Sequence, residues 1–202
     1  MDSSGALAMK TTHAQPRPSR RAGWAGPDTG LSDSARSVRM AASSLPRWGG
    51  QVCLPSEVEQ LLLDVVTDGF VLYCCGPQAA PRALVASYQW QDYVDLLTIR
   101  RFDRIITARI PAPQHARIDV FAPTLVVWAY EGAPQPALQA LLSLVAPHHP
   151  QAPTSAYPAP AGLHIPRAEQ RPMTIQLPPP HCIGNRATRL TTRTDRVETP
   201  PR

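Results

Sequence analysis

Proline, which fixes its own φ angle and has no backbone N–H to donate, occupies 24 of the 202 residues of this chain. That share is about 12%, against roughly 5% in average proteins. Because proline interrupts helices and interior strands, regular structure is expected in the long stretches that lack it. The longest such stretch, residues 82–110, lies within residues 51–147, whereas residues 148–180 are dense in proline. The distribution predicts one folded region, at residues 51–147, followed by an extended segment.

The basic character of the chain belongs to its two ends. Residues 51–147 carry nine acidic and six arginine side chains, a net charge of −3. Residues 1–50 and residues 148–202 each carry seven basic and three acidic side chains, a net charge of +4. The folded region is therefore not expected to be a basic nucleic-acid-binding domain.

Composition also indicates a source and a compartment. Lys10 is the only lysine and Asn185 the only asparagine, which is typical of a high-GC bacterium, such as an actinobacterium. No apolar run reaches the length of about 18 residues that crosses a membrane. The residues after Arg20 and Arg21 lack the apolar region of a secretion signal, and the four cysteines show no paired framework. We expect a cytoplasmic protein.

Residues 1–50 are rich in Ser, Ala, Gly, Arg and Pro and show no apolar period. They cannot bury enough surface to offset the entropy of ordering, so a disordered leader is expected. A start codon assigned too far upstream would produce such a leader, with Met40 as the alternative start. A native N-terminal peptide that ends before Met40, seen by mass spectrometry, would refute that hypothesis.

Two helices are expected at the ends of the folded region. Ser56 and Glu59 form a capping-box pattern, and apolar residues at i, i+3, i+4 and i+7 follow until Gly69. A second helix begins near Pro134 and ends before Pro147. The apolar residues of the two helical stripes are Val58, Leu61, Leu62 and Val65 in the first, and Leu138, Leu141, Leu142 and Val145 in the second.

Five strands are expected between the helices, at residues 70–75, 82–90, 93–99, 104–110 and 124–131. The second and fourth alternate, which indicates burial on one side and an antiparallel meander. The fifth is apolar on both faces and is predicted to be central. The fold class is therefore α+β: a small two-layer domain, an antiparallel sheet of about five strands flanked by an N-terminal and a C-terminal helix, with disordered ends.

The C-terminal third divides into two segments. Residues 148–180 carry recurring aliphatic residues among the prolines, so they form either a free polyproline-type linker or an extended arm docked on the domain. We favour the arm, with residues 173–177 adding an edge strand. Residues 181–202 are polar and rich in arginine, and a disordered basic tail is expected.

Several catalytic and metal-binding patterns are absent from the sequence. No P-loop, G-x-G-x-x-G, G-x-S-x-G, H-E-x-x-H or C-x-x-C motif occurs. Cys74 and Cys75, with the histidine pairs at 148–149 and the His181-Cys182 dipeptide, could bind a metal, but adjacent strand residues point to opposite faces. Buried, unreactive thiols are the preferred interpretation, and we predict no metal and no cofactor.

The sharpest local candidate for binding is the hairpin between the third and fourth strands. Arg100, Arg101, Phe102 and Arg104 would present three guanidinium groups beside one aromatic ring, which suits a phosphate or an acidic protein surface. The competing interpretation is a solvated turn in which Asp103 pairs with an arginine.

Two further groups of residues bear on function. Aromatic residues gather in the strands, either as a stacking platform or, as we favour, in the core: Tyr88, Trp90, Tyr93, Trp128 and Tyr130. Asp95 would share a face with Tyr93 and Leu97, where burial would raise its pKa as a general base requires, but no partner or substrate is indicated. We assign no catalytic residue.

Three hypotheses of function remain. The first is a non-catalytic protein-binding or regulatory module whose domain and arm contact another protein. The second is a nucleic-acid-associated protein that uses its basic tails and the hairpin from Arg100 to Arg104. The third is an enzyme with an unrecognised scattered site, which a screen for stabilising ligands would reveal. The first makes the fewest demands, and we expect a protein partner.

Overall fold

The computed structural model describes residues 54–77, 80–113 and 118–197, the last five of these by their backbone. The expected disordered leader and the alternative start at Met40 lie outside these residues. None of the described helices is long and apolar enough to cross a membrane. The elements, in chain order, are α2 (Ser56–Thr67), β1 (Val71–Cys75), β2 (Ala83–Gln89), β3 (Tyr93–Arg101), β4 (Arg104–Pro111), β5 (Leu125–Val126), β6 (Trp128–Gly132), α3 (Pro134–Ser143), β7 (Tyr157–Pro158), the 3-10 turn η1 (Ala161–Leu163), α4 (Arg167–Gln170), β8 (Met173–Gln176), the 3-10 turn η2 (Pro180–Cys182) and α5 (Asn185–Val197).

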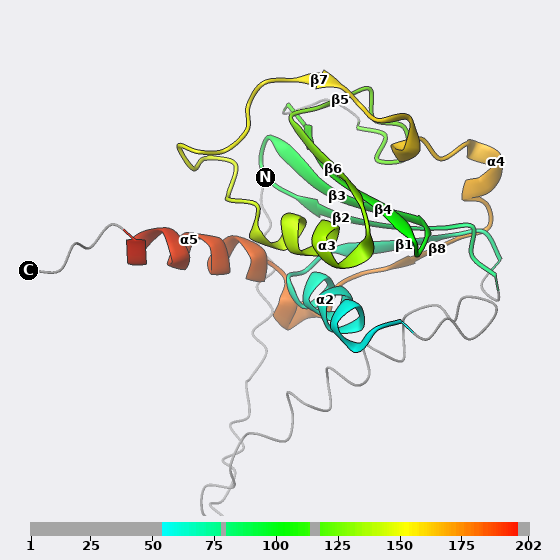
Figure 1. The fold of residues 1–202 in the computed structure, drawn as a ribbon, viewed down its shortest axis with the longest axis horizontal. Coiled ribbons are helices and arrows are strands. Elements are labelled where there is room, and N and C mark those ends of the chain that lie inside the picture. The colour runs from blue at the N-terminus through cyan, green and yellow to red at the C-terminus, as the bar shows by residue number, and fades with distance from the viewer. Residues whose placement is uncertain (1–53, 78–79, 114–117, 198–202) are drawn as a thin grey trace, which may run out of the picture.

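An antiparallel sheet of six strands, in the order β6-β4-β3-β2-β1-β8, forms the centre of the domain (Figure 1). Strands β1 to β4 are the first four expected strands. β5 and β7 pair separately in a small second sheet. The α+β fold with an antiparallel sheet is confirmed, with one more strand in the main sheet than expected.

The expected central strand at residues 124–131 is an edge strand instead. The chain turns at Val127, so that Leu125 and Val126 pair with β7, while β6 pairs only with β4 in the main sheet. Val126 and Val127 are buried, but the residues of β6 are half-buried or exposed. The run is apolar because its first half lies under the C-terminal arm, and not because strands flank it on both sides.

Helix α2 begins without the predicted capping box. Pro55 is the residue before the helix, and its carbonyl accepts hydrogen bonds from the amides of Val58 and Glu59. Ser56 is therefore the first helical residue, too far into the helix to cap it with its side chain. Gly69 ends the helix as predicted, with a φ of 95° that an L side chain rarely adopts.

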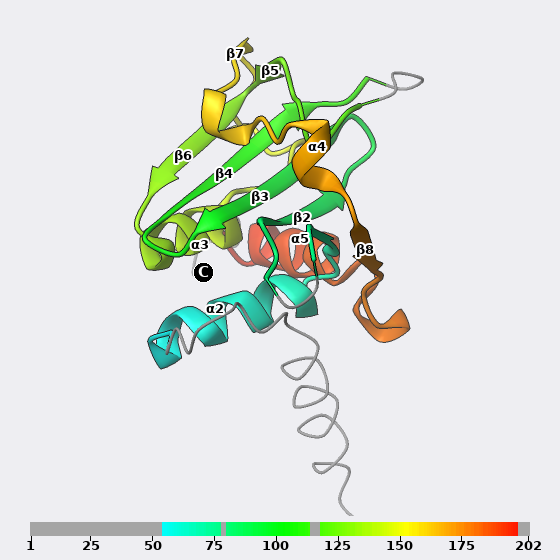
Figure 2. The same ribbon diagram turned by 90° about the vertical axis from the view of Figure 1, so that its right-hand side faces the viewer.

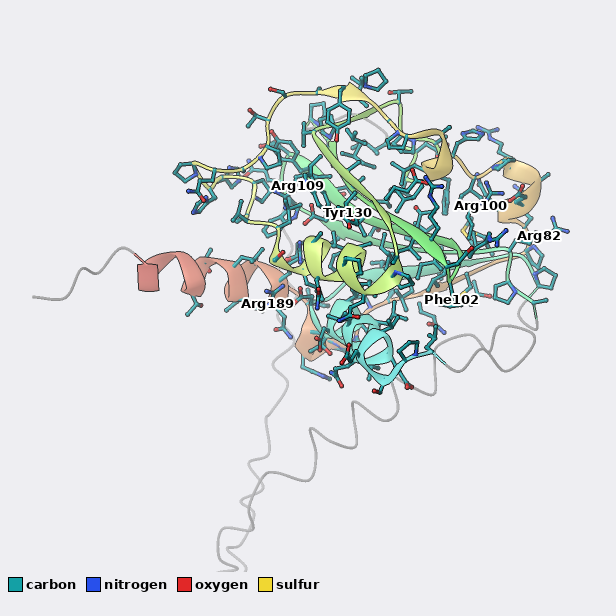
Figure 3. All side chains as sticks on the ribbon, viewed as in Figure 1. Arg82, Arg100, Phe102, Arg109, Tyr130 and Arg189 are labelled. Atoms are coloured by element: carbon teal, nitrogen blue, oxygen red, sulfur yellow. The ribbon has the colours of Figure 1, made fainter. Side chains whose placement is uncertain are left out.

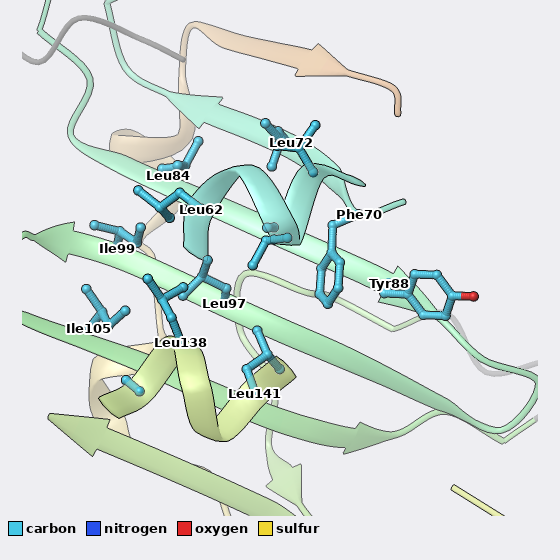
Figure 4. Packing of buried hydrophobic residues seen from close by; sticks show 14 of the residues in the cluster. Leu62, Phe70, Leu72, Leu84, Tyr88, Leu97, Ile99, Ile105, Leu138 and Leu141 are labelled. Carbon is cyan, nitrogen blue, oxygen red and sulfur yellow. The ribbon is translucent and has the colours of Figure 1, made fainter. Parts of the chain in front are cut away.

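Helices α2 and α3 cover one face of the sheet (Figure 2), and their predicted stripes supply its core (Figure 4). Leu62 and Val65 of α2, together with Leu138 and Leu141 of α3, pack on Leu97 of β3. The expectation that helices cover one face of the sheet is met here.

The opposite face is buried too, which the expectation of one-sided burial did not include. Leu163 and Ile165, which follow β7, are fully buried against residues of β3 and β4 such as Leu96 and Ala108. Gly162 passes so close to Ile106 that a Cβ at this position would overlap the isoleucine side chain. The proline-rich segment thus lies across this face of the sheet and shields it from solvent.

The C-terminal segments attach to the same domain. β8 pairs with β1, from Leu72 opposite Gln176 to Cys75 opposite Met173. The extended arm is therefore docked on the domain, and its residues 173–176 add an edge strand to the sheet. Residues 181–197 differ from the expected disordered tail, because Asn185–Val197 forms helix α5. The first turns of α5 are held by Arg186, which is fully buried, and by Leu190.

Candidate functional site

A β-bulge in the hairpin between β3 and β4 sets the direction of its arginines. The register runs from Tyr93 opposite Pro111 to Ile99 opposite Ile105, and then shifts so that Arg101 faces Arg104. The extra residue, Arg100, is left without a cross-strand partner, and such bulges re-aim a side chain. Arg100 is turned towards α4 (Figure 3).

Each arginine of the hairpin pairs with a different carboxylate. Arg100 lies 2.5 Å from Glu169 of α4 and Arg104 lies 2.7 Å from Glu131 of β6. Arg101 donates two hydrogen bonds, of 3.0 and 2.9 Å, to Asp103. This hydrogen bond holds the pKa of Asp103 below its usual range.

The hairpin therefore contains the four predicted residues, but not as three unpaired guanidinium groups around a free ring. Phe102 is half-buried and packs against the helix-side core. Exposed ion pairs of this kind are weak and exchange readily with solvent. Arg101 and Arg104 stay accessible, with 77% and 67% of their side chains exposed.

A second cluster of charges is buried between the sheet and the helices. Asp95 of β3 and Arg109 of β4 face each other directly, and both are fully buried. Arg109 donates from Nε to one oxygen of Asp95 at 2.6 Å and from a terminal nitrogen to the other at 3.0 Å. The second terminal nitrogen donates to the carbonyl of Val145, after α3, at 2.8 Å.

Helix α5 adds two more arginines to this cluster. Arg186 approaches Asp95 with Nε at 3.0 Å and one terminal nitrogen at 2.9 Å, and Asp68 with the other terminal nitrogen at 3.1 Å. Arg189 donates from Nε to Asp68 at 2.9 Å and also contacts the carbonyl of Leu142. We call Asp68, Asp95, Arg109, Arg186 and Arg189 the buried charge cluster.

Aromatic rings surround the buried charge cluster. The indole N–H of Trp90 donates to Asp95 at 2.8 Å, and the centre of the Arg109 guanidinium lies 5.8 Å from that ring. Arg186 lies 5.3 Å from the ring of Phe70. The hydroxyl of Tyr88 accepts a hydrogen bond from the amide of Ala187 at the start of α5. Of the five aromatic residues expected in the core, Tyr88 is buried and Trp90 and Trp128 pack against the core, whereas Tyr93 is half-buried and Tyr130 is 38% exposed.

Asp95 is fully buried and lies in β3, two residues before Leu97. Its Oδ1 accepts a hydrogen bond from Arg109, and its Oδ2 accepts hydrogen bonds from Arg109, Arg186 and the indole of Trp90. A general base needs an oxygen that reaches a substrate proton, and here both oxygens already bind cationic donors. The arrangement favours a structural role.

The three described cysteines are buried and are not bonded to one another. Burial, with a smaller contribution from Cys74, raises the pKa of Cys75 to about 11. Burial also raises the pKa of Cys74 and of Cys182. Thiols of this kind are poor nucleophiles at neutral pH. Within the described ranges no three His, Cys, Asp or Glu side chains lie together as a metal site, and Cys53 falls outside them.

An apolar surface lies where the C-terminal segment passes the end of α2. A cavity of about 320 Å³ opens there, with Phe70 and Leu72 among the residues behind it and Leu177 at its side. Three aliphatic side chains of this segment are exposed: Ile175 by 56%, Leu177 by 77% and Ile183 by 69%. Ile175 pairs with Tyr73, on the opposite face of the sheet from Leu72 and Gln176, and neither Ile175 nor Ile183 lines the cavity. We call the residues that line the cavity, Leu177 among them, the C-terminal apolar surface. The cavity is lined by Val66, Phe70, Leu72, Gln176, Leu177, Pro178 and Pro179.

Sequence reasoning missed both the buried charge cluster and this surface. The hairpin pattern alone did not give the pair of Asp95 and Arg109: a regular hairpin with its turn at residues 102–103 would place Asp95 opposite Ile110, and the bulge at Arg100 shifts the register by one residue. No local signal pointed to Arg186, because its partners lie 91 and 118 residues earlier in the chain.

Comparison of the chain with protein-family models, with curated proteins and with solved structures finds no match in any of the three.

Proposed function

We propose that the protein is a non-catalytic, cytoplasmic protein-binding module, and that the C-terminal apolar surface binds its partner. The observation that carries this proposal is the 77% exposure of Leu177, which is one of the residues that line a mainly apolar cavity. Single exposed aliphatic residues are ordinary, whereas an apolar group next to a concavity is typical of an interaction site.

The lining of the cavity indicates the chemistry of the partner. Six of its seven residues are apolar, and Gln176 supplies the one amide side chain. Its volume of about 320 Å³ is at the lower end of the roughly 300–1,000 Å³ of small-molecule sites. This size suits one or two side chains of a protein ligand. The partner is therefore a protein segment that inserts a large aliphatic or aromatic side chain between α2 and residues 176–179.

The edge strand beside the cavity is less suited to pairing with another strand. β8 has four residues, Pro172 precedes it, and Pro178 follows one residue after its end. Short edge strands bounded by proline resist addition of a further strand. Side-chain insertion, and not sheet extension, is the mode of binding that these features support.

The test compares two substitutions of exposed leucines on the tagged full chain. Leu177→Glu places a charge at the cavity, and Leu125→Glu places the same charge on the small β5-β7 sheet, where Leu125 is 45% exposed. Each protein is used to capture partners from the native host's lysate, with and without nuclease, after equal thermal midpoints have been verified. We expect a stoichiometric protein partner that survives nuclease and is lost only with Leu177→Glu. Retention of that partner by Leu177→Glu would overturn the proposal.

The same experiment tests the nucleic-acid alternative. The pairing of each hairpin arginine with a carboxylate, the burial of Arg186 and the pairing of Arg189 with Asp68 reduce the positive charge available to phosphates. If nuclease removes every specific partner, and the double variant Arg101→Glu/Arg104→Glu does the same, the nucleic-acid hypothesis replaces the protein-binding one.

A further inference from the structure

The buried charge cluster divides into a part that does not need α5 and a part that does. Arg109 and Asp95 form a one-to-one bidentate pair, supported by Trp90 and the Val145 carbonyl, all within residues 90–145. In the described structure the carboxylate of Asp68 binds Arg186 and Arg189, which both belong to α5. Without α5 the first pair stays complete, and Asp68 is left as a buried carboxylate without its cations.

The surroundings of Arg186 match the shape and charge of a guanidinium group. Its N–H groups reach the carboxylates of Asp95 and Asp68, and one also donates to the carbonyl of Leu141 at 2.7 Å. The ring of Phe70 lies 5.3 Å away on another side. A planar, five-donor cation is suited to two carboxylates, a carbonyl and an aromatic face, whereas a lysine ammonium is not.

The charge balance also favours a bound cation. Asp68, Asp95 and Arg109 together carry a net charge of −1 when α5 is set aside. These groups come from the end of α2, from β3 and from β4, and the carbonyl comes from α3. The groups that contact Arg186 therefore all come from parts of the chain other than α5.

Besides its arginines, the start of α5 is attached to the end of α2 by two hydrogen bonds to backbone carbonyls, from the Asn185 side chain to Thr67 at 3.0 Å and from the Arg186 amide to Asp68 at 3.1 Å. Gly184 adopts a φ of 82°, and a Cβ there would meet no atom within 4 Å. Beyond its first turns the helix projects away from the sheet and the other helices (Figure 1). Leu190 is buried, and Thr191 and Thr192 are exposed.

We propose that Asp68, Asp95, Phe70 and the Leu141 carbonyl form an arginine-recognition pocket, and that α5 is a detachable internal ligand of this pocket. The ligand class is an arginine side chain carried by the first turn of a helical peptide, with Arg186 as the occupant in the resting protein. This inference is independent of the C-terminal apolar surface.

The first test uses the full chain with its own anchors removed. Arg186→Ala/Arg189→Ala leaves α5 in the chain but removes the two side chains that anchor it, so that the pocket loses its occupant and the helix is free to leave. We expect methylguanidinium at tens of millimolar to raise the thermal midpoint of this variant, saturably and by about 3 °C. Methylammonium at equal ionic strength is expected to have no such effect, and neither salt should stabilise the wild-type protein in this way.

The second test supplies the helix in trans. A synthetic peptide of residues 183–197 should bind Arg186→Ala/Arg189→Ala and not the wild-type chain, whose pocket is occupied. The same peptide with Arg186→Ala should bind more than about tenfold more weakly, since a buried hydrogen-bonded charge is lost. Adding Asp68→Asn to the protein should abolish both the peptide binding and the effect of methylguanidinium.

A third test does not depend on the folding of the double variant: native-state hydrogen exchange of the wild-type chain. A detachable helix exchanges its amides through a local opening, faster than the amides of β3. Exchange of α5 only at the rate of global unfolding would overturn the proposal. Stabilisation of the double variant by methylguanidinium that persists with Asp68→Asn would overturn it as well.

Discussion

Arg186 and Asp95 form an ion pair whose two side chains are both fully buried, although 91 residues separate them in the chain. The pair joins the C-terminal helix to a central strand of the sheet. A buried pair adds little net stability when compared with apolar residues of the same shape. Removal of one partner is costly, because the charge that remains has neither water nor a counter-ion. The buried charge cluster is therefore a sensitive point of the fold.

Asp95→Asn tests this cost directly. The substitution keeps the shape of the side chain but leaves Arg109 and Arg186 without the carboxylate that they share. We expect the free energy of unfolding, measured by urea titration, to fall by about 3–5 kcal/mol. Asp103→Asn, which breaks an exposed pair with Arg101, is the matched control and should leave the midpoint unchanged. Equal midpoints for the two variants would contradict the role of the cluster.

Gly69→Ala and Gly184→Ala separate backbone strain from steric contact. Both glycines have positive φ angles, 95° and 82°. A Cβ at Gly69 would also overlap the carbonyl oxygen of Cys182, whereas a Cβ at Gly184 would meet open space. We expect Gly184→Ala to lower the free energy of unfolding by roughly 1 kcal/mol and Gly69→Ala by at least twice as much. Denaturant midpoints measured side by side decide the point, and equal losses would show that the contact with Cys182 adds nothing.

Thr98→Val should stabilise the protein. The hydroxyl of Thr98 is the buried side-chain polar group that lacks a hydrogen-bond partner within the described residues, and the side chain is 2% exposed. Valine has nearly the same shape without the cost of burying an unsatisfied hydroxyl. We expect the free energy of unfolding to rise by about 1 kcal/mol. Thr107→Val, at a buried threonine whose hydroxyl has carbonyl acceptors, should give no gain.

The stability of the protein should fall in alkaline solution because of Cys75. Burial raises the pKa of this thiol from 9.0 to about 11, so the folded state favours the protonated thiol. Stability is then unaffected below pH 9 and is lost as the pH rises from 9 towards 11, by up to about 2–3 kcal/mol. Urea titrations at pH 8 and pH 10.5 measure the loss. Cys75→Ala should show a smaller loss, and an identical one would assign the effect to other groups.

Periodicity was sufficient to predict helices α2 and α3 and the order of the first four strands, but not α4 or α5. The stripe from Val58 to Val65 and the stripe from Leu138 to Leu141 both face the sheet, because a helix that packs on a sheet must repeat apolar residues every three or four positions. The sequence pattern did not identify β6 as an edge strand. An apolar residue is expected wherever a side chain is buried, whether an extended segment or a neighbouring strand covers it.

The long-range contacts could not be predicted for a related reason. The alternation along β4 correctly placed Thr107 and Arg109 on one face of the strand and Ile106 on the other, but both faces are buried. A polar face indicates solvent only if nothing else in the chain supplies partners, and here α3 and α5 supply them. The arginines of the C-terminal segment suggested a solvated tail because charge is usually found outside. Two of them are instead the reason that α5 docks.

The pairing of β1 with β8 has a consequence for synthesis of the chain. Met173, which pairs with Cys75, is synthesised 98 residues after it. At about 5–20 residues per second, the outer edge of β1 stays open on the ribosome for on the order of 5–20 s. Asp95 and Arg109 are both made within that interval and can neutralise each other before Arg186 exists. A nascent chain that stalls before residue 173 presents an unpaired strand to its neighbours, and aggregation on slow translation is expected to begin at β1.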